Sequence, residues 1–391
     1  MHEEMLLLAA TAVFATAAVA RRMSTTPVTP PMLFLGLGLA LSAAGLAEGA
    51  RDLLLPLAEV TLAIVLFADA AHVDCGKIMR DWGRPARMLV FGLPLAALFG
   101  GLAAWLLLPG LTVAEAALLG ALMAPTDAAL GRAVTADPAV PERLRRTIEV
   151  ESGLNDGLAL PMVLFLACAV LGHEAPPGGG DWIRFALEQV GFGVAAGVAA
   201  GLAGGDLLKR SAAAGWTDET GQGVAALAVA GAAYAAAHTL GGNGFVAAFV
   251  GGIAFGERLG EGRGFAREFA DGEGRMLVLG AFLLIGAALA PEALASLDWR
   301  GLAFLLTSLF LARPLAIWLS LAGTDARPAE RLFLGWFGPR GLATALFALL
   351  VVERLGLPAD HAAISLAITG VCLSALLHGL TAAPLARRWS R

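Results

Sequence analysis

Charged residues are scarce in this chain. Asp, Glu, Lys and Arg make up only 15% of its 391 residues, whereas 58% are hydrophobic and the mean hydropathy is +0.75. So few polar residues cannot cover the surface of a soluble domain built around one core. The composition therefore excludes an ordinary soluble protein and predicts a polytopic membrane protein.

Cysteine and lysine are also rare. The three cysteines, Cys75, Cys168 and Cys372, are widely spaced in apolar or membrane-edge sequence, which excludes a framework of disulfides or a cysteine-rich metal site. Only two of the 27 basic residues are Lys. Together with heavy use of Ala, Gly and Leu, this indicates a GC-rich bacterial genome.

Apolar segments separated by charge, Gly or Pro clusters predict about thirteen transmembrane helices. The predicted helices cover 4–20, 32–47, 53–71, 86–108, 112–136, 147–172, 183–207, 221–240, 243–256, 275–290, 300–322, 331–353 and 361–386. The pair 221–240 and 243–256 is separated only by Gly241 and Gly242, and the second of the two is short for a full span.

Basic residues test the orientation of these spans. If the N-terminus lies outside, only four fall in outer loops (Arg51, Arg184, Arg300 and Arg354) and two within segments (Arg313 and Arg340), so the other 21 of the 27 are cytoplasmic. The positive-inside rule therefore supports thirteen spans with the N-terminus outside and the C-terminus in the cytoplasm.

The sixth predicted helix carries four polar residues in lipid-compatible sequence. Glu151 and Asn155 lie about 40° apart around a helix, as do Ser152 and Asp156, so all four share one stripe. A carboxylate at the bilayer centre costs roughly 2.5–3.5 kcal/mol even on permissive scales, and such groups normally mark an ion or proton path. Asp156, about 14 Å from the start of the segment, lies near mid-membrane.

Two other predicted helices are interrupted at corresponding places. Pro125, followed by Thr126 and Asp127, lies halfway along 112–136, and the stretch 338–341, Gly-Pro-Arg-Gly, interrupts 331–353. The fifth helix runs inward and the twelfth outward, which fits two inverted repeats of six helices, 1–6 and 8–13. Matching broken helices indicate a midplane cation site in a secondary transporter. The alternative is that Pro and Gly merely kink these helices.

These motifs resemble the bacterial cation/proton antiporters of the Na+/H+ exchanger branch, the NhaP-like proteins. The resemblance rests on four motifs in family order: Leu-Phe-Ala-Asp-Ala (66–70), Ala-Pro-Thr-Asp (124–127), Glu-Ser-Gly-Leu-Asn-Asp-Gly (151–157) and Phe-Gly-Pro-Arg-Gly (337–341). It implies an all-α membrane protein of about thirteen helices in two inverted repeats, with helices 5 and 12 crossing near the midplane. The implied activity is exchange of a monovalent cation for H+ by alternating access, which is transport and not an enzymatic reaction.

The resemblance also implies roles for individual residues. Asp156 looks like the carboxylate that binds proton and cation in turn, assisted by Ser152, Asn155 and the Thr126 carbonyl, so Asp156, Ser152 and Thr126 are the expected Na+ ligands. Glu151 looks like the ion-pair partner of Arg340, tying helix six to helix twelve. Asp69 stands where archaeal relatives carry a longer Glu, and is a further candidate ligand.

The residues themselves supply a coupling mechanism. Oxygen atoms from a carboxylate, a hydroxyl, an amide and free carbonyls suit a hard monovalent cation. Competition of cation and proton for Asp156 then produces exchange. Asn155 stands where electrogenic relatives carry a second Asp, which predicts one cation per proton. Asp127 is a further ion- or proton-binding candidate, although its place at the break favours offsetting the positive half-helix ends.

The resemblance implies a homodimer in the bacterial inner membrane. Its interface domain is expected in 1–71 (helices 1–3) and 221–290 (helices 8–10), its core, or transport, domain in 86–172 (helices 4–6) and 300–386 (helices 11–13), and a linking helix 7 in 183–207. The expected partners are monovalent cations, protons and lipid, with no cofactor and no nucleic acid.

Other assignments stay open in the sequence. Na+ is the expected cation, with Li+ as a second substrate; a K+/H+ antiporter of the same fold is the alternative. A passive cation channel and an intramembrane aspartyl hydrolase using Asp127 and Asp156 are rivals from other classes. Arg313 could snorkel or pair with an acid. Five histidines, His378 among them, fall near predicted helix ends, and Asn243 is expected to mark a turn.

Overall fold

The computed structural model describes residues 3–19, 28–71, 82–135, 137, 139–172, 182–260 and 264–386, and the described residues form helices and connecting turns without strands. The helices of the first half are α1 (Glu3–Ala18), α3 (Pro30–Ala43), α4 (Ala50–Ala71), α6 (Gly83–Arg87), a π-helical turn (Met88–Gly92), α7 (Leu93–Leu107), α8 (Val113–Leu122), α9 (Ala128–Thr135), α10 (Glu142–Val170) and α11 (Trp182–Ala213).

The second half has the same character. Its helices are α12 (Glu219–Thr239), α13 (Gly244–Leu259), α14 (Gly264–Ala288), α15 (Ala290–Ala295), α16 (Trp299–Thr307), a π-helical turn (Ser308–Ala312), α17 (Arg313–Ser320), α18 (Pro328–Trp336), α19 (Leu342–Leu355) and α20 (Ala362–Ala386). Within the described ranges, each of the thirteen predicted segments corresponds to one helix or to one interrupted helix, so the predicted helix order is confirmed. Seven of these are individually long and apolar enough to cross a membrane.

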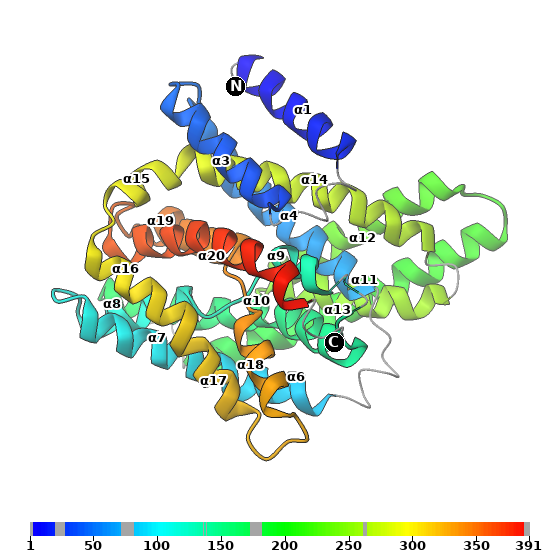
Figure 1. Cartoon of the computed structure of the whole chain (residues 1–391). Helices are drawn as coiled ribbons and strands as arrows, with labels where there is room; N and C mark the ends of the chain where they lie inside the picture. The colour runs from blue at the N-terminus through cyan, green and yellow to red at the C-terminus, as the bar shows by residue number, and fades with distance from the viewer. Residues whose placement is uncertain are drawn as a thin grey trace.

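The helices pack in two groups, which lie side by side in Figure 1. In one group α3, α4, α11, α12, α13 and α14 pack against one another, and α1 contacts α3 and α14. In the other, α7 packs on α8 and α17, and α10 and α20 pack on α8 and α9. We call these the first and second bundles. α10 also contacts α4 and α13, so it lies where the bundles meet.

Both predicted breaks are present. α8 ends at Leu122 and the chain resumes as α9 at Ala128, while α18 ends at Trp336 and α19 begins at Leu342. The two connecting segments cross, because the Asp127 N–H donates to the Pro339 carbonyl at 2.7 Å. Two non-helical segments thus meet inside the second bundle, where polar backbone is tolerated only if protein groups satisfy it.

Two π-helical turns form a second matched pair that the sequence reasoning missed. Met88–Gly92 lies just before Pro94 of α7, and Ser308–Ala312 lies just before Pro314 of α17. Because proline lacks an N–H, the helix accommodates it by a local change of hydrogen-bond register. The turns recur in the fourth and eleventh predicted helices, 86–108 and 300–322, which fits the two-repeat arrangement. The second turn ends directly before Arg313, the first residue of α17.

Candidate functional site

The polar stripe of α10 faces the protein interior. Glu151, Ser152, Asn155 and Asp156 are each no more than 2% exposed, and Asp156 is the central residue of α10. Thr126 and Asp127 at the first break are buried as well. The structure thus brings the two polar motifs of the sequence to one place inside the fold.

Thr126 is the hub of a buried hydrogen-bond network. Its hydroxyl donates to Glu151 Oε2 at 3.2 Å, accepts from Asn155 Nδ2 at 2.6 Å and lies 3.0 Å from the Ser152 hydroxyl. Its peptide N–H donates to Asn155 Oδ1 at 3.3 Å, and Asn155 Nδ2 also reaches Glu151 Oε1 at 3.2 Å. The partners of Asn155 therefore fix the orientation of its amide. The same hydrogen bonds join the break between α8 and α9 to α10.

Asp127 caps both half-helices that begin at the crossing. Its Oδ1 accepts from the Leu130 N–H at 3.1 Å, at the start of α9, and its Oδ2 accepts from the Leu342 N–H at 2.6 Å, at the start of α19. A carboxylate is favourable at the positive N-terminal end of a helix. One side chain thus offsets two helix ends, the role that its position beside the break favoured.

The break changes the hydrogen bonding expected for the Thr126 carbonyl. In an uninterrupted helix the Leu130 N–H would donate to this carbonyl, but it donates to Asp127 Oδ1 instead. The Thr126 carbonyl therefore loses its helical donor to the Asp127 side chain, while the hydroxyl and N–H of the same residue contact Ser152 and Asn155.

The predicted ion pair between Glu151 and Arg340 is wrong. Arg313 of α17 binds Glu151 instead, donating from Nη1 to Oε1 and from Nη2 to Oε2, both at 3.1 Å. The Arg340 guanidinium donates from Nη1 to the Gly338 carbonyl at 2.7 Å, which holds it on its own segment. Gly338 leaves room for this pairing, because a side chain there would overlap the Arg313 guanidinium. Arg313 therefore passes over this glycine to reach Glu151.

Asp156 differs from its two acidic neighbours. Glu151 is paired with a guanidinium and Asp127 caps two helices, but Asp156 Oδ1 is buried without a hydrogen-bond partner among the residues that the structure describes. A buried carboxylate oxygen without a donor is costly, so Asp156 has the strongest chemical need for a proton or a cation.

The model of the family described as "Sodium/hydrogen exchanger, transmembrane" matches residues 9–388. The chain belongs to this family. Membership confirms the resemblance read from the four motifs. Because this is a family of transporters, the chain, called the exchanger homologue below, is not an intramembrane hydrolase.

Curated relatives and a solved structure agree with that placement. The K(+)/H(+) antiporter NhaP2 of Shewanella sp. (strain MR-4) is 29% identical over 332 residues, 84% of this chain and 56% of that protein. The K(+)/H(+) antiporter NhaP of Alkalimonas amylolytica is 27% identical over 334 residues, with the same two coverages. The exchanger homologue spans about half the length of these curated relatives.

Among solved structures, the sodium proton antiporter MjNhaP1 from Methanocaldococcus jannaschii at pH 8 superimposes with a TM-score of 0.79. The match covers 99% of each chain at 20% sequence identity. At this identity the likeness concerns the fold, and it confirms the predicted arrangement of helices.

His378 is a buried residue whose role the sequence did not reveal. Although it was expected near an interface, it is only 3% exposed on α20, stacked on the Trp336 ring. His378 Nε2 lies 3.0 Å from the Trp336 carbonyl, and Nδ1 lies 3.0 Å from the Ser374 hydroxyl, which accepts from the Arg340 N–H at 2.6 Å. Together Ser374 and His378 bind both sides of the break in helix twelve.

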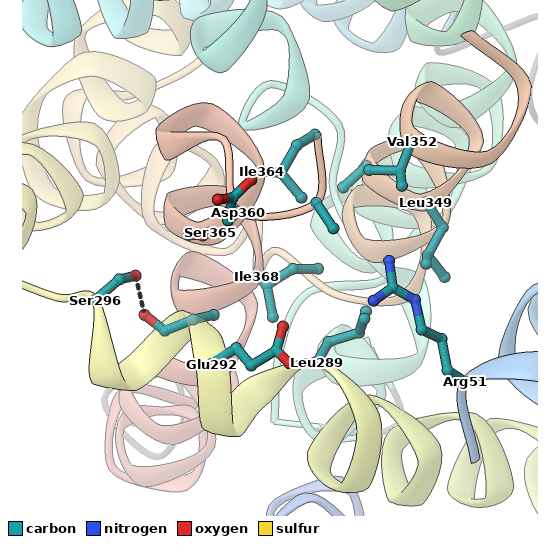
Figure 2. Close-up of a pocket in the computed structure, with 13 residues that line it drawn as sticks. Arg51, Leu289, Glu292, Ser296, Leu349, Val352, Asp360, Ile364, Ser365 and Ile368 are labelled. Atoms are coloured by element: carbon teal, nitrogen blue, oxygen red, sulfur yellow. Dashed lines mark hydrogen bonds between the residues drawn. The ribbon is translucent and has the colours of Figure 1, made fainter. Parts of the chain in front are cut away.

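Asp69 and a described cavity are two further features outside the contacts of Thr126 given above. Asp69 is half-buried near the end of α4, and its contact with the ion stays a prediction. A cavity of about 90 Å³ lies where α4, α15, α19 and α20 meet. Figure 2 shows the side chains that line it, Arg51, Glu292 and Asp360 among them. The described lining includes none of the candidate ion-binding residues.

Proposed function

We propose that this exchanger homologue is a monovalent cation/proton antiporter in which Asp156 binds the cation and the proton in turn. The observation that carries the proposal is Asp156 Oδ1, which is buried at the centre of α10 and finds no hydrogen-bond donor among the described residues. Family membership makes exchange the first function to test.

The ligands proposed for the cation are all oxygens. Asp156 supplies the negative charge, Ser152 a hydroxyl and Thr126 its released carbonyl, while Asn155 orients Thr126 through two hydrogen bonds. Oxygen ligands suit hard cations, and helix breaks supply carbonyls without disturbing a continuous ladder. Asp69, near the end of α4, is proposed as an additional ligand or as an entry group.

Competition at one carboxylate couples the two fluxes. When protonated, Asp156 is neutral and can donate a hydrogen bond; when ionised, it needs a cation to remain buried at low cost. If the bare carboxylate does not cross, only loaded forms complete the cycle. The cation and the proton then move in opposite directions.

The surrounding charges favour electroneutral exchange. Glu151 is held by Arg313, and Asp127 is held by two helix N-termini, so neither is the natural second carrier. Arginine does not release its proton at ordinary pH, which excludes Arg313 and Arg340 as carriers. One carrier that binds either one proton or one monovalent cation moves no net charge per cycle.

The two bundles support a mechanism of alternating access. We assign the interface role to 1–71 and 221–290, the transport role to 86–172 and 300–386, and the linking role to 183–207. The helices of 1–71 and 183–207 share the first bundle with α12, α13 and α14. We also propose a homodimer through the interface domain, in a bacterial inner membrane, with the N-terminus outside as the positive-inside bias favours.

Na+ is the proposed cation, with Li+ as a second substrate and K+ as the alternative. The solved neighbour is titled a sodium proton antiporter, and the Shewanella and Alkalimonas relatives are named K(+)/H(+) antiporters. These names leave two candidates of one reaction class, which differ in the radius of the cation that fits around Asp156.

Ion-driven proton movement in proteoliposomes tests the proposal. Na+, Li+ and K+ are added in turn with the membrane potential clamped, and an internal pH dye is followed for the wild type and Asp156→Asn. We expect cation-dependent dequenching in the wild type and none in the variant. Equal exchange by the variant would move the carrier away from Asp156, and flux without a pH change would indicate a channel.

A further inference from the structure

Pro161 leaves a carbonyl without its helical partner one residue after Asp156. Pro161 lies inside α10, where its missing N–H would have donated to the Gly157 carbonyl four residues earlier. Gly157 is buried. A buried carbonyl that lost its donor must find another or pay the cost of desolvation, so the fold has to satisfy this group from elsewhere.

Asn243 supplies the missing donor from the other bundle. It is the residue just before α13, is 2% exposed, and donates from Nδ2 to the Gly157 carbonyl at 2.9 Å. Its Oδ1 accepts from the Phe245 and Val246 N–H groups at 2.9 and 3.2 Å, capping α13. These two backbone donors fix the amide orientation, because only the nitrogen can then face a carbonyl.

Two glycines of the α10 motif allow this approach. A side chain at Gly153 would overlap the Phe249 ring, and a Cβ at Gly157 would come within 2.6 Å of the Val246 side chain. α10 and α13 therefore pack closely on the side that bears Gly153 and Gly157. Since α13 belongs to the first bundle, and its packing on α8 and α9 places α10 in the second, the Asn243–Gly157 bond joins the two bundles beside Asp156.

We propose that Asn243 is a positioning residue for cation binding: it holds the turn of α10 that carries Asp156 by satisfying the carbonyl that Pro161 leaves open. The proposal rests on the proposed function of Asp156. The hydrogen bond itself does not, so it can be tested separately. Asn243 touches neither the cation nor the proton, and acts through the backbone of the residue that follows Asp156.

A double-mutant cycle isolates the bond. Asn243→Ser keeps a short hydroxyl to cap α13 and removes the amide that reaches Gly157. Pro161→Ala restores a backbone N–H to α10, which gives the Gly157 carbonyl a helical partner and makes the Asn243 amide redundant. Melting temperature in detergent and the cation concentration for half-maximal exchange (KM) are measured for the wild type, both single variants and the double variant.

We expect Asn243→Ser to lower the melting temperature and to raise the apparent KM roughly fivefold or more, because a buried acceptor loses its donor. In the Pro161→Ala background the same change should alter neither quantity. A fivefold KM shift in both backgrounds would overturn the proposal, as would a lowered melting temperature with an unchanged KM. If Asn243→Ser does not fold, a folded double variant would support the proposal. A double variant that also fails to fold would contradict it.

Asp218→Ser is the matched control for changing a helix cap. Asp218 caps α12 by accepting from the Gly221 N–H and is exposed, so its replacement should leave KM at the wild-type value. The outcomes also separate the two proposals. Absent exchange in the wild type would sink the proposed function, while the melting-temperature cycle would still decide whether Asn243 satisfies Gly157.

Discussion

Arg313 and Glu151 form a two-bond ion pair across 162 residues of sequence, with both N–O distances at 3.1 Å and both side chains almost fully buried. Neither charge could remain in this interior alone. The pair connects α17 to α10, and through Thr126 it reaches the break in helix five. It is the charged anchor of the region around Asp156.

Breaking this pair should be far more damaging than breaking an exposed one. Arg313→Ala leaves the Glu151 carboxylate buried without its guanidinium, which we expect to cost roughly 3–5 kcal/mol of folding free energy. Arg184→Ala is the matched control, because Arg184 pairs with Glu188 on the surface of α11, where such pairs are worth about 0–1 kcal/mol. Thermal unfolding in detergent compares them; losses of equal size would contradict the anchoring role.

Asp127 should be intolerant even of Asn. An amide keeps one oxygen for one helix end, but its nitrogen then faces the second backbone N–H, and the negative charge is gone. We expect Asp127→Asn to lose about 1–2 kcal/mol of stability. Asp298→Asn, at a single cap on α16 that accepts from the Gly301 N–H, should lose little. A melting temperature of Asp127→Asn equal to that of the wild type would show that the two caps are dispensable.

The glycines of the helix-twelve break should be sensitive to a single methyl group. A Cβ at Gly338 would overlap the Arg313 guanidinium, and one at Gly341 would overlap the Asp127 carboxylate. Each Gly→Ala change should therefore destabilise by about 1–3 kcal/mol through overpacking. Gly231→Ala on α12, where the space is open, should be neutral or mildly stabilising. Similar melting temperatures for all three variants would refute this close packing.

Asp325 makes one contribution to stability depend on pH. It lies in the loop before α18, where hydrogen bonds from Arg143 and Arg84 hold the pKa of its carboxyl below the usual value. A lowered folded-state pKa gives stability that is present above the unfolded pKa, about 3.9, and is lost as pH falls through the folded value. The side chain is 59% exposed, so the effect should be small.

The melting temperatures of the wild type and Asp325→Asn, followed from pH 7 down to pH 3, check this sign. The wild type should melt higher at neutral pH, and the difference should shrink as the carboxyl becomes protonated. A difference that grew toward acid pH would contradict the pairing.

The features that could be predicted from the sequence are those that depend on a single helix. Hydrophobic runs placed the helices, Pro125 and Gly338 marked the breaks, and helical spacing put Glu151, Ser152, Asn155 and Asp156 on one face. Each of these features is local, because it follows from the period of a helix or from the conformational limits of Pro and Gly.

The partners of buried polar groups could not be predicted in the same way. Arg313 and Arg340 are both buried arginines in apolar sequence, and the choice between them for Glu151 depends on how α17 crosses the break. The Asn243–Gly157 bond depends likewise on which bundle face meets α10. One local signal was available. Because Pro161 follows Gly157 by four residues, the sequence predicts that the Gly157 carbonyl lacks its helical donor, but it does not predict which group replaces that donor.

The most direct test of the central claim is the number of protons released when the cation binds. Isothermal titration of the detergent-solubilised protein with NaCl and with KCl, in two buffers of different ionisation enthalpy, gives this number. We predict close to one proton per bound cation for the wild type near the pH at which Asp156 is protonated, and no release for Asp156→Asn. Cation binding without proton release, or unchanged release by Asp156→Asn, would contradict competition at this carboxylate.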